Sequence, residues 1–207
     1  HLAVRTTAII PADPDRRRAL LPWLGFALLA GLALAAYWPV LDGGWILDDW
    51  PNLSGLARIT AGDAVQLWRY VVEGHSGPTG RPLALLSFAL QADSWPGDPG
   101  AFHAVNVALH LACGLAIALL GRAIVRRWWP ADPLRADWIA IAAAGLWLVH
   151  PLNVSTTAYV VQRMAQLATL FTLLALLAWT LGRLRAERDR AGRDGRLLAV
   201  LGLCAGG

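Results

Sequence analysis

Three apolar runs in this sequence are each long enough to cross a lipid bilayer as a helix. They cover residues 19–40, 102–125 and 154–181. The hydrocarbon core of a bilayer is about 30 Å thick, so a spanning helix needs roughly 20 mostly apolar residues. Because 57% of the 207 residues are hydrophobic and only 15% are charged, an ordinary soluble domain is excluded. The sequence therefore predicts an all-α integral membrane protein.

Two further apolar segments complete the predicted membrane domain. Residues 136–149 would extend only about 21 Å as a helix, and we interpret them as a short third span, before the fourth at 154–181. Another apolar run begins near residue 197 and continues to the last residue. It predicts an incomplete fifth span, and therefore a fragment of a longer protein. We expect a cytoplasmic segment at 1–18 and the first part of a membrane domain at 19–207.

The distribution of arginine predicts the orientation of these spans. All eighteen basic residues are Arg, and fourteen of them lie in or beside the segments 1–18, 126–135 and 183–196. Basic residues that flank a span are retained in the cytoplasm, so these three segments are predicted to be cytoplasmic and residues 41–101 to face outward. The net charge of +4 is thereby explained by membrane orientation, and no nucleic-acid partner is expected.

The outward loop contains apolar pieces that are too short to span. Residues 82–90 form one of them, and residues 64–72 place Val65, Trp68 and Val72 at helical spacing. We expect both pieces to be helices that lie in the outer membrane interface.

A pair of adjacent carboxylates follows the first span directly. Asp48 and Asp49 lie a few residues beyond the expected bilayer edge. A partly desolvated carboxylate can act as a general base, and two ionised carboxylates can hold a divalent cation. The pair can equally be a solvated turn before Pro51. The residues alone leave these alternatives open.

The second span carries a polar stripe near its outward end. His103, Asn106 and His110 are separated by three and seven residues and so share one helical face. Polar groups on membrane helices commonly bond to neighbouring helices, which is our interpretation of Asn106 and His110. His103 is nearest the outer surface and could reach a ligand.

Two arginines on the outward side are candidates for binding an anion. Arg163 is nine residues past Val154, which predicts a depth of roughly 13 Å in the fourth span. A guanidinium at membrane depth needs a partner, either a phosphate or a structural carboxylate. Arg81 opens the 82–90 segment and presents the same two alternatives.

Four motifs in this order resemble a known family, the TMTC-like proteins, over about residues 45–179. These proteins join a multi-span glycosyltransferase domain of the GT-C type to C-terminal tetratricopeptide repeats. The motifs are WILDDWPNL at 45–53, RPLALLSFAL at 81–90, AFHAVNVALHL at 101–111 and GLWLVHPLNVSTTAYVVQRMAQ at 145–166.

The resemblance implies a GT-C-like helical bundle that transfers a sugar from a polyprenyl-phosphate donor to a hydroxyl acceptor, expected to be a protein Ser or Thr. It implies a site at the outer face of the membrane, which for a bacterial member is the periplasmic face of the inner membrane. Asp48 and Asp49 match the family's acidic residues in the first outward loop. The other matching positions are Arg81, His103, His150, Gln162 and Arg163. In this scheme a carboxylate takes the acceptor's proton, and Arg163 or Arg81 stabilises the departing phosphate.

One departure from the family supports a second hypothesis. Relatives commonly carry Thr-Glu shortly after the HP pair, whereas this chain has Val154-Ser155. The alternative function is a non-catalytic membrane subunit or scaffold that keeps the GT-C-like fold and binds a partner complex.

Overall fold

A computed structural model describes residues 14–59, 63–73 and 81–205 of the chain. Every regular element within these ranges is helical. In chain order they are α1 (Pro14–Tyr37), η1 (Trp38–Asp42), α2 (Asp49–Leu53), η2 (Ser54–Arg58), α3 (Ala64–Glu73), α4 (Pro82–Ala89), η3 (Ala92–Ser94), α5 (Pro99–Trp128), α6 (Pro133–Leu148), α7 (Asn153–Ala158), η4 (Val160–Gln162) and α8 (Arg163–Ala205).

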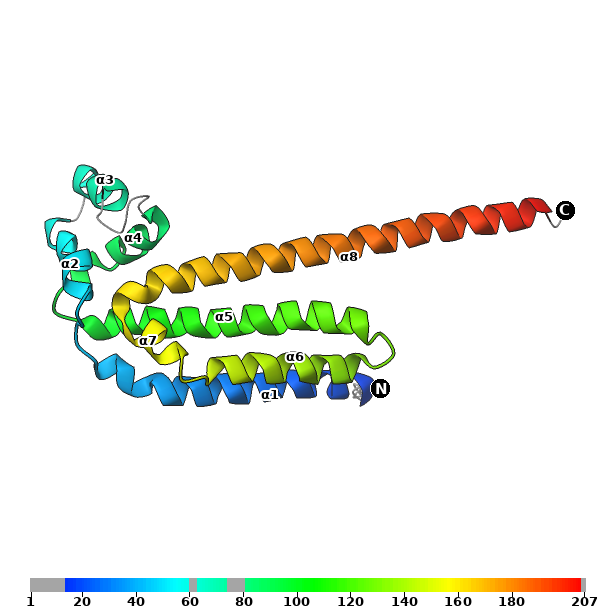
Figure 1. The fold of residues 1–207 in the computed structure, drawn as a ribbon, viewed down its shortest axis with the longest axis horizontal. Coiled ribbons are helices and arrows are strands. Elements are labelled where there is room, and N and C mark those ends of the chain that lie inside the picture. Colours follow the sequence, from blue (N-terminus) through cyan, green and yellow to red (C-terminus); the bar gives the residue numbers. More distant parts are fainter. Residues whose placement is uncertain (1–13, 60–62, 74–80, 206–207) are drawn as a thin grey trace, which may run out of the picture.

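Three long helices, α1, α5 and α6, run alongside one another, and a fourth, α8, starts beside α5 and then extends away beyond the bundle (Figure 1). Helix α5 packs against α6 and α8, and α6 packs against α1. One end of this bundle carries α2, α3, α4, α7 and the start of α8, and we call it the loop end. The opposite end carries the start of α1 and the turn between α5 and α6, and we call it the arginine end.

Three segments of the described chain are long and apolar enough to cross a membrane. They are Arg18–Asp42, Pro99–Trp128 and Val160–Ala191. Helix α6, which corresponds to the predicted short span, has 16 residues. The prediction of an all-α integral membrane protein is confirmed.

Small residues allow these helices to approach closely. A Cβ atom on Gly114 of α5 would lie 2.5 Å from Leu148 Cδ2 of α6, and one on Gly145 of α6 would overlap Leu29 of α1. Glycine at both positions therefore permits the close contact that is typical of membrane helix pairs.

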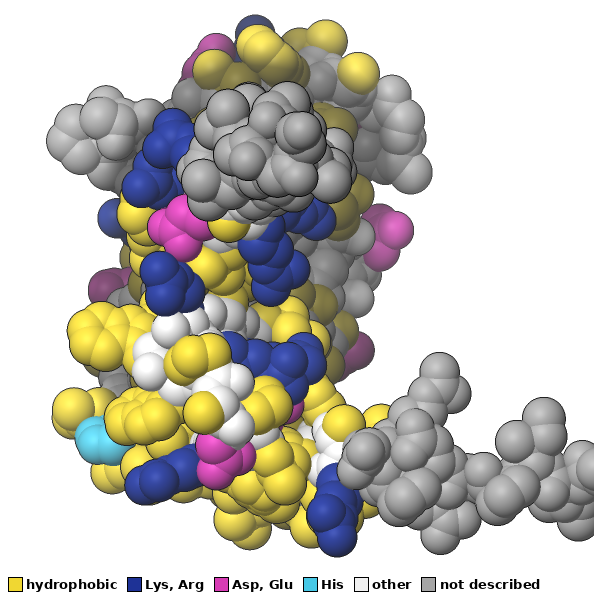
Figure 2. Space-filling view, turned by 90° about the vertical axis from the view of Figure 1, so that its right-hand side faces the viewer, with side chains coloured by type: hydrophobic (Ala, Val, Ile, Leu, Met, Phe, Trp, Pro, Cys, Tyr) yellow, Lys and Arg dark blue, Asp and Glu magenta, His cyan; other side chains and the backbone are white. Residues whose placement is uncertain are grey.

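At the arginine end, an ion cluster joins α5 to α6. Asp137 is buried and accepts hydrogen bonds from Arg126 Nε and Nη2, both at 2.6 Å, and from Arg122 Nε at 3.1 Å. The guanidinium of Arg122 also lies over the ring of Trp23 in α1, 5.6 Å from its centroid. Figure 2 looks onto this end and shows Arg side chains spread among hydrophobic ones.

The two interfacial segments predicted in the outward loop are both helices, α3 and α4. On α3, Val65, Trp68 and Val72 are exposed on one face, as expected for a helix in the membrane interface. Helix α4 instead buries Leu85 and Phe88 in a core shared with α2, α5 and the start of α8. The loop end is thus a packed unit built on the bundle.

The fourth span begins later than the apolar run predicts. Residues 153–162 form α7 and η4, which are separated by Tyr159 in an extended conformation with φ −82° and ψ 125°. Helix α8 starts at Arg163. Arg163 is therefore the first residue of the helix, and the predicted depth of about 13 Å is wrong because Tyr159 interrupts the helix.

The connector predicted at 183–196 is helical. Helix α8 continues without a break from Arg163 to Ala205, so the fourth and the incomplete fifth predicted spans belong to one helix of 43 residues. The charged segment contains no proline, and arginines lie three or four residues from Glu187 and Asp189, a spacing that supports a solvated helix. The charged residues of this segment therefore do not end the helix.

Candidate functional site

The four sequence motifs meet at the loop end. The turn after η1, the start of α4, the start of α5 and the η4–α8 junction lie together there (Figure 1). Within this region, hydrogen bonds connect positions between 51 and 112 residues apart in the chain. These long-range bonds hold the four motifs together in one region.

The two adjacent carboxylates have different environments. Asp49 is fully buried: its Oδ2 accepts from Ile46 N at 2.9 Å and its Oδ1 from Val161 N at 2.8 Å. Asp48 is exposed, and its carboxylate makes no hydrogen bond with the described part of the chain. Asp49 thus fixes the turn to η4, while Asp48 presents a free carboxylate at the surface.

A left-handed residue shapes this turn. Leu47 has a φ of 38°, which is strained for a residue with a Cβ atom. The turn that contains it closes through the bond from Asp49 N to Ile46 O at 2.9 Å. Strained backbone persists where surrounding contacts hold it, and the two bonds to the Asp49 carboxylate supply such contacts.

The pair does not fit a shared divalent cation. Such an ion needs several oxygen ligands that converge, whereas Asp49 is buried with both oxygens bonded to backbone amides and Asp48 faces solvent. Across the described ranges, no three His, Cys, Asp or Glu side chains gather in a geometry for metal binding. We therefore derive no step that involves a cation at these carboxylates.

Arg163 is a buried guanidinium held by uncharged acceptors. Its Nε donates to Asn106 Oδ1 at 3.0 Å, its Nη1 to Ser87 O at 3.1 Å and its Nη2 to Phe102 O at 3.0 Å. Its carbon Cζ lies 4.5 Å from the ring centroid of Phe88. Among the described residues, no carboxylate is within salt-bridge distance of it. Arg163 thus joins α4, α5 and α8.

Asn106 completes this network. Its Nδ2 donates to Tyr159 O at 2.9 Å and Val160 O at 3.2 Å, and its backbone carbonyl accepts from Gln166 Nε2 at 3.0 Å. The carbonyls of Tyr159 and Val160 lie at the helix break and also accept from the backbone N–H of Gln162 and Arg163, so Asn106 adds a second hydrogen bond to each of them. The interpretation of Asn106 as a residue that satisfies neighbouring backbone groups is confirmed.

His110 also packs between helices, as predicted. Its Nε2 lies 2.8 Å from Leu148 O, and its ring contacts Trp147 and Tyr37 at centroid distances of 4.7 Å and 4.9 Å. This part of the polar stripe serves the contact of α5 with α6 and α1.

His103 is buried beneath the turn and has unused polar atoms. Among the described residues no group meets hydrogen-bond geometry with either ring nitrogen, and only 1% of the residue is exposed. A Cβ on Gly43 would lie 3.3 Å from His103 Nε2, so the backbone at Gly43 covers the ring closely. His103 is therefore placed beneath the chain that leads to Asp48.

Arg81 is an exposed guanidinium beside the Arg163 network. It precedes α4, and its Nη1 lies 3.3 Å from Met164 Sδ. Met164 follows Arg163 directly, so the RP and QR motifs meet here. Unlike Arg163, Arg81 is open to solvent.

The remaining predicted site residues are both exposed. His150 lies two residues past the end of α6. Its Nδ1 accepts from Leu152 N at 3.3 Å within the turn that follows. Gln162 is the last residue of η4 and lies directly before Arg163. No contact joins either side chain to the carboxylates in the described part of the chain.

An aromatic cluster that the sequence analysis did not single out lies beside the turn. Trp45 contacts Trp95 and Phe102 at centroid distances of 4.4 Å and 5.1 Å, and Trp50 contacts Trp95 at 5.2 Å. Trp45 Nε1 also donates to Pro96 O at 2.8 Å. The eleven tryptophans of the sequence were a signal for such a cluster, but their spacing does not show which of them meet.

Tyr70 links α3 to this region. Its hydroxyl donates to Asn52 O at 3.4 Å, and burial raises the pKa of Tyr70 above its ordinary value. A Cβ on Gly55 would lie 2.8 Å from Tyr70 Cδ2, so the ring packs directly on the backbone of η2.

Comparison with known proteins relates the chain to one group of transferases. It is 31% identical to the human protein O-mannosyl-transferase TMTC1 over 176 residues, which cover 80% of this chain and 19% of that protein. It is 28% identical to Tmtc2 of Drosophila melanogaster, also named a protein O-mannosyl-transferase, over 179 residues that cover 83% of the chain and 18% of the relative. No family model and no solved structure match the chain.

The chain thus spans about a fifth of the length of the curated relatives it matches. These relatives are animal proteins, and a bacterial inner membrane remains a prediction from the sequence. The matched stretch extends over four fifths of this chain, and the resemblance carried by its four motifs is confirmed. The chain is a TMTC-like membrane protein.

Proposed function

We propose that the chain forms part of a membrane glycosyltransferase that moves a sugar from a polyprenyl phosphate to a hydroxyl group of a protein at the loop end. The observation that carries this proposal is the split carboxylate pair: Asp49 is fixed by two backbone amides and Asp48 is free and exposed beside it. The relatives named protein O-mannosyl-transferases support mannose as the sugar and protein as the acceptor.

In the proposed reaction Asp48 is the general base. A Ser or Thr hydroxyl of the acceptor gives its proton to the Asp48 carboxylate as its oxygen attacks the anomeric carbon of the donor. The bond from that carbon to the acceptor oxygen forms while its bond to the phosphate oxygen breaks. The electron pair leaves with the polyprenyl phosphate.

Arg81 is the cation proposed for the departing phosphate. It is exposed at the start of α4, and its Nη1 contacts the Sδ atom of Met164, the residue directly after Arg163. A guanidinium can hold two phosphate oxygens at once, and its charge offsets the charge that develops on the leaving group. Arg163 also keeps two N–H groups that its three protein acceptors do not use, but it is buried, so we propose that its part is to position α4 and Arg81.

The lipid-linked nature of the donor is supported by the place of these residues. The loop end lies where the spans that end at Asp42 and begin at Pro99 leave the apolar part of the chain. An isoprenoid can remain in the bilayer there while its phosphate and sugar reach Asp48 and Arg81. His103, His150 and Gln162 remain candidates for contacts with donor or acceptor.

The test measures sugar transfer by the purified protein in lipid nanodiscs, with polyprenyl-phosphate mannose and a Ser/Thr-containing peptide. Asp48→Asn should lower the rate by about 10²-fold or more, since the amide keeps the shape but cannot take the proton. Asp93→Asn is the matched control, because Asp93 is also an exposed acid in the outward segment. Equal rates for the two variants would refute the role of Asp48.

A non-catalytic scaffold is the second candidate function. The observation that favours it is Ser155, which is exposed on α7 in the segment where the family resemblance implies a Glu. If the protein binds the donor lipid without transferring sugar, and Ser155→Glu does not introduce transfer, the scaffold is the better description.

A further inference from the structure

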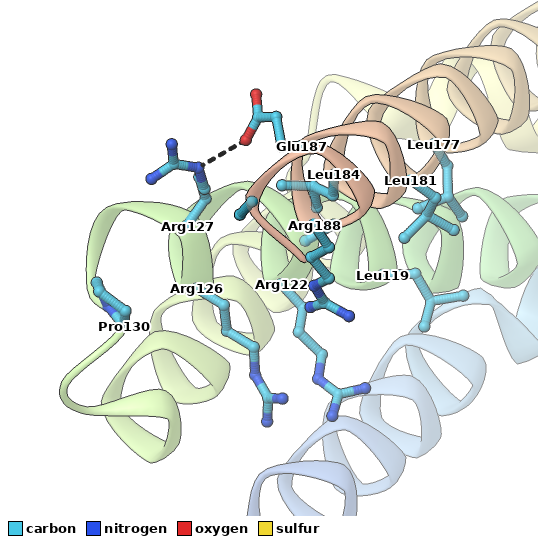
Figure 3. A pocket seen from close by; sticks show the side chains of 12 residues that line it. Leu119, Arg122, Arg126, Arg127, Pro130, Leu177, Leu181, Leu184, Glu187 and Arg188 are labelled. Atoms are coloured by element: carbon cyan, nitrogen blue, oxygen red, sulfur yellow. Dashed lines mark hydrogen bonds and ion pairs between the residues drawn. The ribbon is translucent and has the colours of Figure 1, made fainter. Parts of the chain in front are cut away.

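A cleft lies between α5 and α8 near the arginine end, opposite the proposed site. Its volume is about 700 Å³. Arg122, Arg126 and Arg127 line it from α5 and Arg188 lines it from α8. Figure 3 shows Arg127 directed toward Glu187, whereas Arg122 and Arg126 point away from α8. Leu119 and Leu181 line the other part of the cleft. The volume is within the range of small-molecule sites.

The lining of this cleft carries an excess of positive charge. Four arginines contribute to it, whereas Glu187 is the single acidic side chain among the lining residues. Glu187 accepts from Arg127 Nε at 3.3 Å. Arg122 and Arg126 share one carboxylate, that of Asp137. Two guanidinium charges against one carboxylate leave a positive charge that favours an anion.

The other part of the cleft is apolar. Leu119, Leu177 and Leu181 line it together with Leu184. Leu119 precedes Arg126 by seven residues on α5, which places the leucine and arginine levels about 10 Å apart along the helix. Both levels lie within spans long and apolar enough for a membrane, Pro99–Trp128 and Val160–Ala191. The arginines fall in the last turns of the first of these spans, where lipid headgroups are expected.

We propose that this cleft binds a phospholipid with an anionic headgroup, with its phosphate on the arginines and an acyl chain along the leucines. A water-soluble phosphate compound would leave the leucines uncovered, and an apolar helix would leave the shared guanidinium charge unmatched. A phospholipid matches both parts. Basic pockets between membrane helices on the cytoplasmic side are known places for anionic headgroups.

Titration of the detergent-purified protein with phosphatidylglycerol, followed by native mass spectrometry, tests the proposal. The first phosphatidylglycerol is expected to bind about tenfold more tightly than phosphatidylcholine. Arg127→Gln combined with Arg188→Gln should weaken that binding by roughly 25-fold, about fivefold for each charge removed. Both side chains are exposed, so the bonds of Asp137 remain intact.

The matched control is Arg183→Gln combined with Arg185→Gln, which removes two exposed charges of α8 that do not line the cleft. If the lipid binds in the cleft, this control should leave the affinity for the first phosphatidylglycerol within about twofold of the parent value. Leu119→Asn combined with Leu181→Asn should weaken binding by about tenfold through loss of apolar contact. Thermal unfolding followed by circular dichroism verifies that each variant is folded.

Three results would overturn the proposal. Equal weakening by the two arginine pairs would mean diffuse attraction to the whole basic end. Equal affinity for phosphatidylglycerol and phosphatidylcholine would mean that charge does not select the lipid. Displacement of the lipid by excess glycerol phosphate in the parent protein would assign the cleft to a soluble anion.

Discussion

The Oδ1 atom of Asp49 accepts a hydrogen bond from the backbone N–H of Val161, which lies 112 residues further along the chain, at 2.8 Å. This bond connects the turn before α2 to η4, which lies directly before α8. The other carboxylate oxygen of Asp49, Oδ2, accepts a hydrogen bond from Ile46 N. One carboxylate therefore fixes two backbone segments. The two members of the DD pair are therefore expected to respond differently to the same substitution.

Asp49→Asn should destabilise the protein, whereas Asp48→Asn should not. An amide keeps one acceptor oxygen but turns an NH₂ group toward the other buried N–H, and leaving that N–H without a partner costs about 1–3 kcal/mol. Thermal unfolding in detergent measures the difference. A melting temperature that falls equally in both variants would contradict the separate environments described for the pair.

Arg163→Lys should lower stability, because an ammonium group does not reproduce the planar fork that reaches Asn106, Ser87 and Phe102. One buried acceptor left unpaired costs about 1–3 kcal/mol. The exposed Arg81 provides the control, and Arg81→Lys should unfold at the parent temperature. An unchanged melting temperature for Arg163→Lys would show that the network does not hold the loop end together.

Arg81→Gln should weaken binding of the donor lipid without altering the fold. The variant removes the exposed guanidinium proposed to contact the phosphate, and Arg58→Gln removes an exposed charge of η2 for comparison. Donor affinity can be measured by displacement of a fluorescent polyprenyl phosphate in nanodiscs. If Arg163→Lys weakens donor binding at a temperature where it is still folded and Arg81→Gln does not, the phosphate role moves to Arg163.

The stability of the loop end should fall at alkaline pH because of Tyr70. Burial raises the pKa of Tyr70, so above pH 10, its ordinary value, the unfolded chain releases this proton while the folded chain retains it. The stability contribution is complete below pH 10 and is lost as the pH rises further. Tyr70→Phe should have a flatter dependence of unfolding temperature on pH above 10. Identical slopes for the parent and the variant would mean that Tyr70 titrates normally.

The two ends of the bundle should be accessible from opposite sides of the membrane. The arginine distribution predicts that position 48 faces outward and position 190 faces the cytoplasm. Cysteine introduced at each position, with Cys113 and Cys204 replaced by serine, can be labelled with a membrane-impermeant maleimide. Labelling of both positions from the same side would refute the predicted orientation.

The apolar runs of the sequence were sufficient to predict the helical membrane fold, because the length of such runs follows directly from bilayer thickness. The boundaries of the helices could not be predicted in the same way. Tyr159 ends a helical segment within a continuous apolar run, and its break is stabilised by Asn106, a residue more than fifty positions earlier. Hydropathy cannot report a contact of that kind.

The candidate site shows the same limit at the level of single residues. Asp48 and Asp49 are adjacent in the chain and have the same chemistry, so the sequence alone gives no reason to assign them different roles. Their difference depends on the left-handed turn at Leu47 and on Val161, both of which require the folded structure. The family resemblance predicts a site in this region through its motif order, and it did not show which carboxylate is free.

The shortness of α6 has a consequence for the surrounding lipid. Its 16 residues rise about 24 Å, which is about 6 Å less than the hydrocarbon core of a typical bilayer. A helix with such hydrophobic mismatch is accommodated by local thinning of the bilayer, at a cost of fractions of a kcal/mol per Å. If the arginine end is held at the cytoplasmic headgroups, the thinning falls beside Leu148, where α6 ends. The outer leaflet would then dip toward the loop end, and headgroups there would lie closer to the polar residues of the bundle than elsewhere in the membrane.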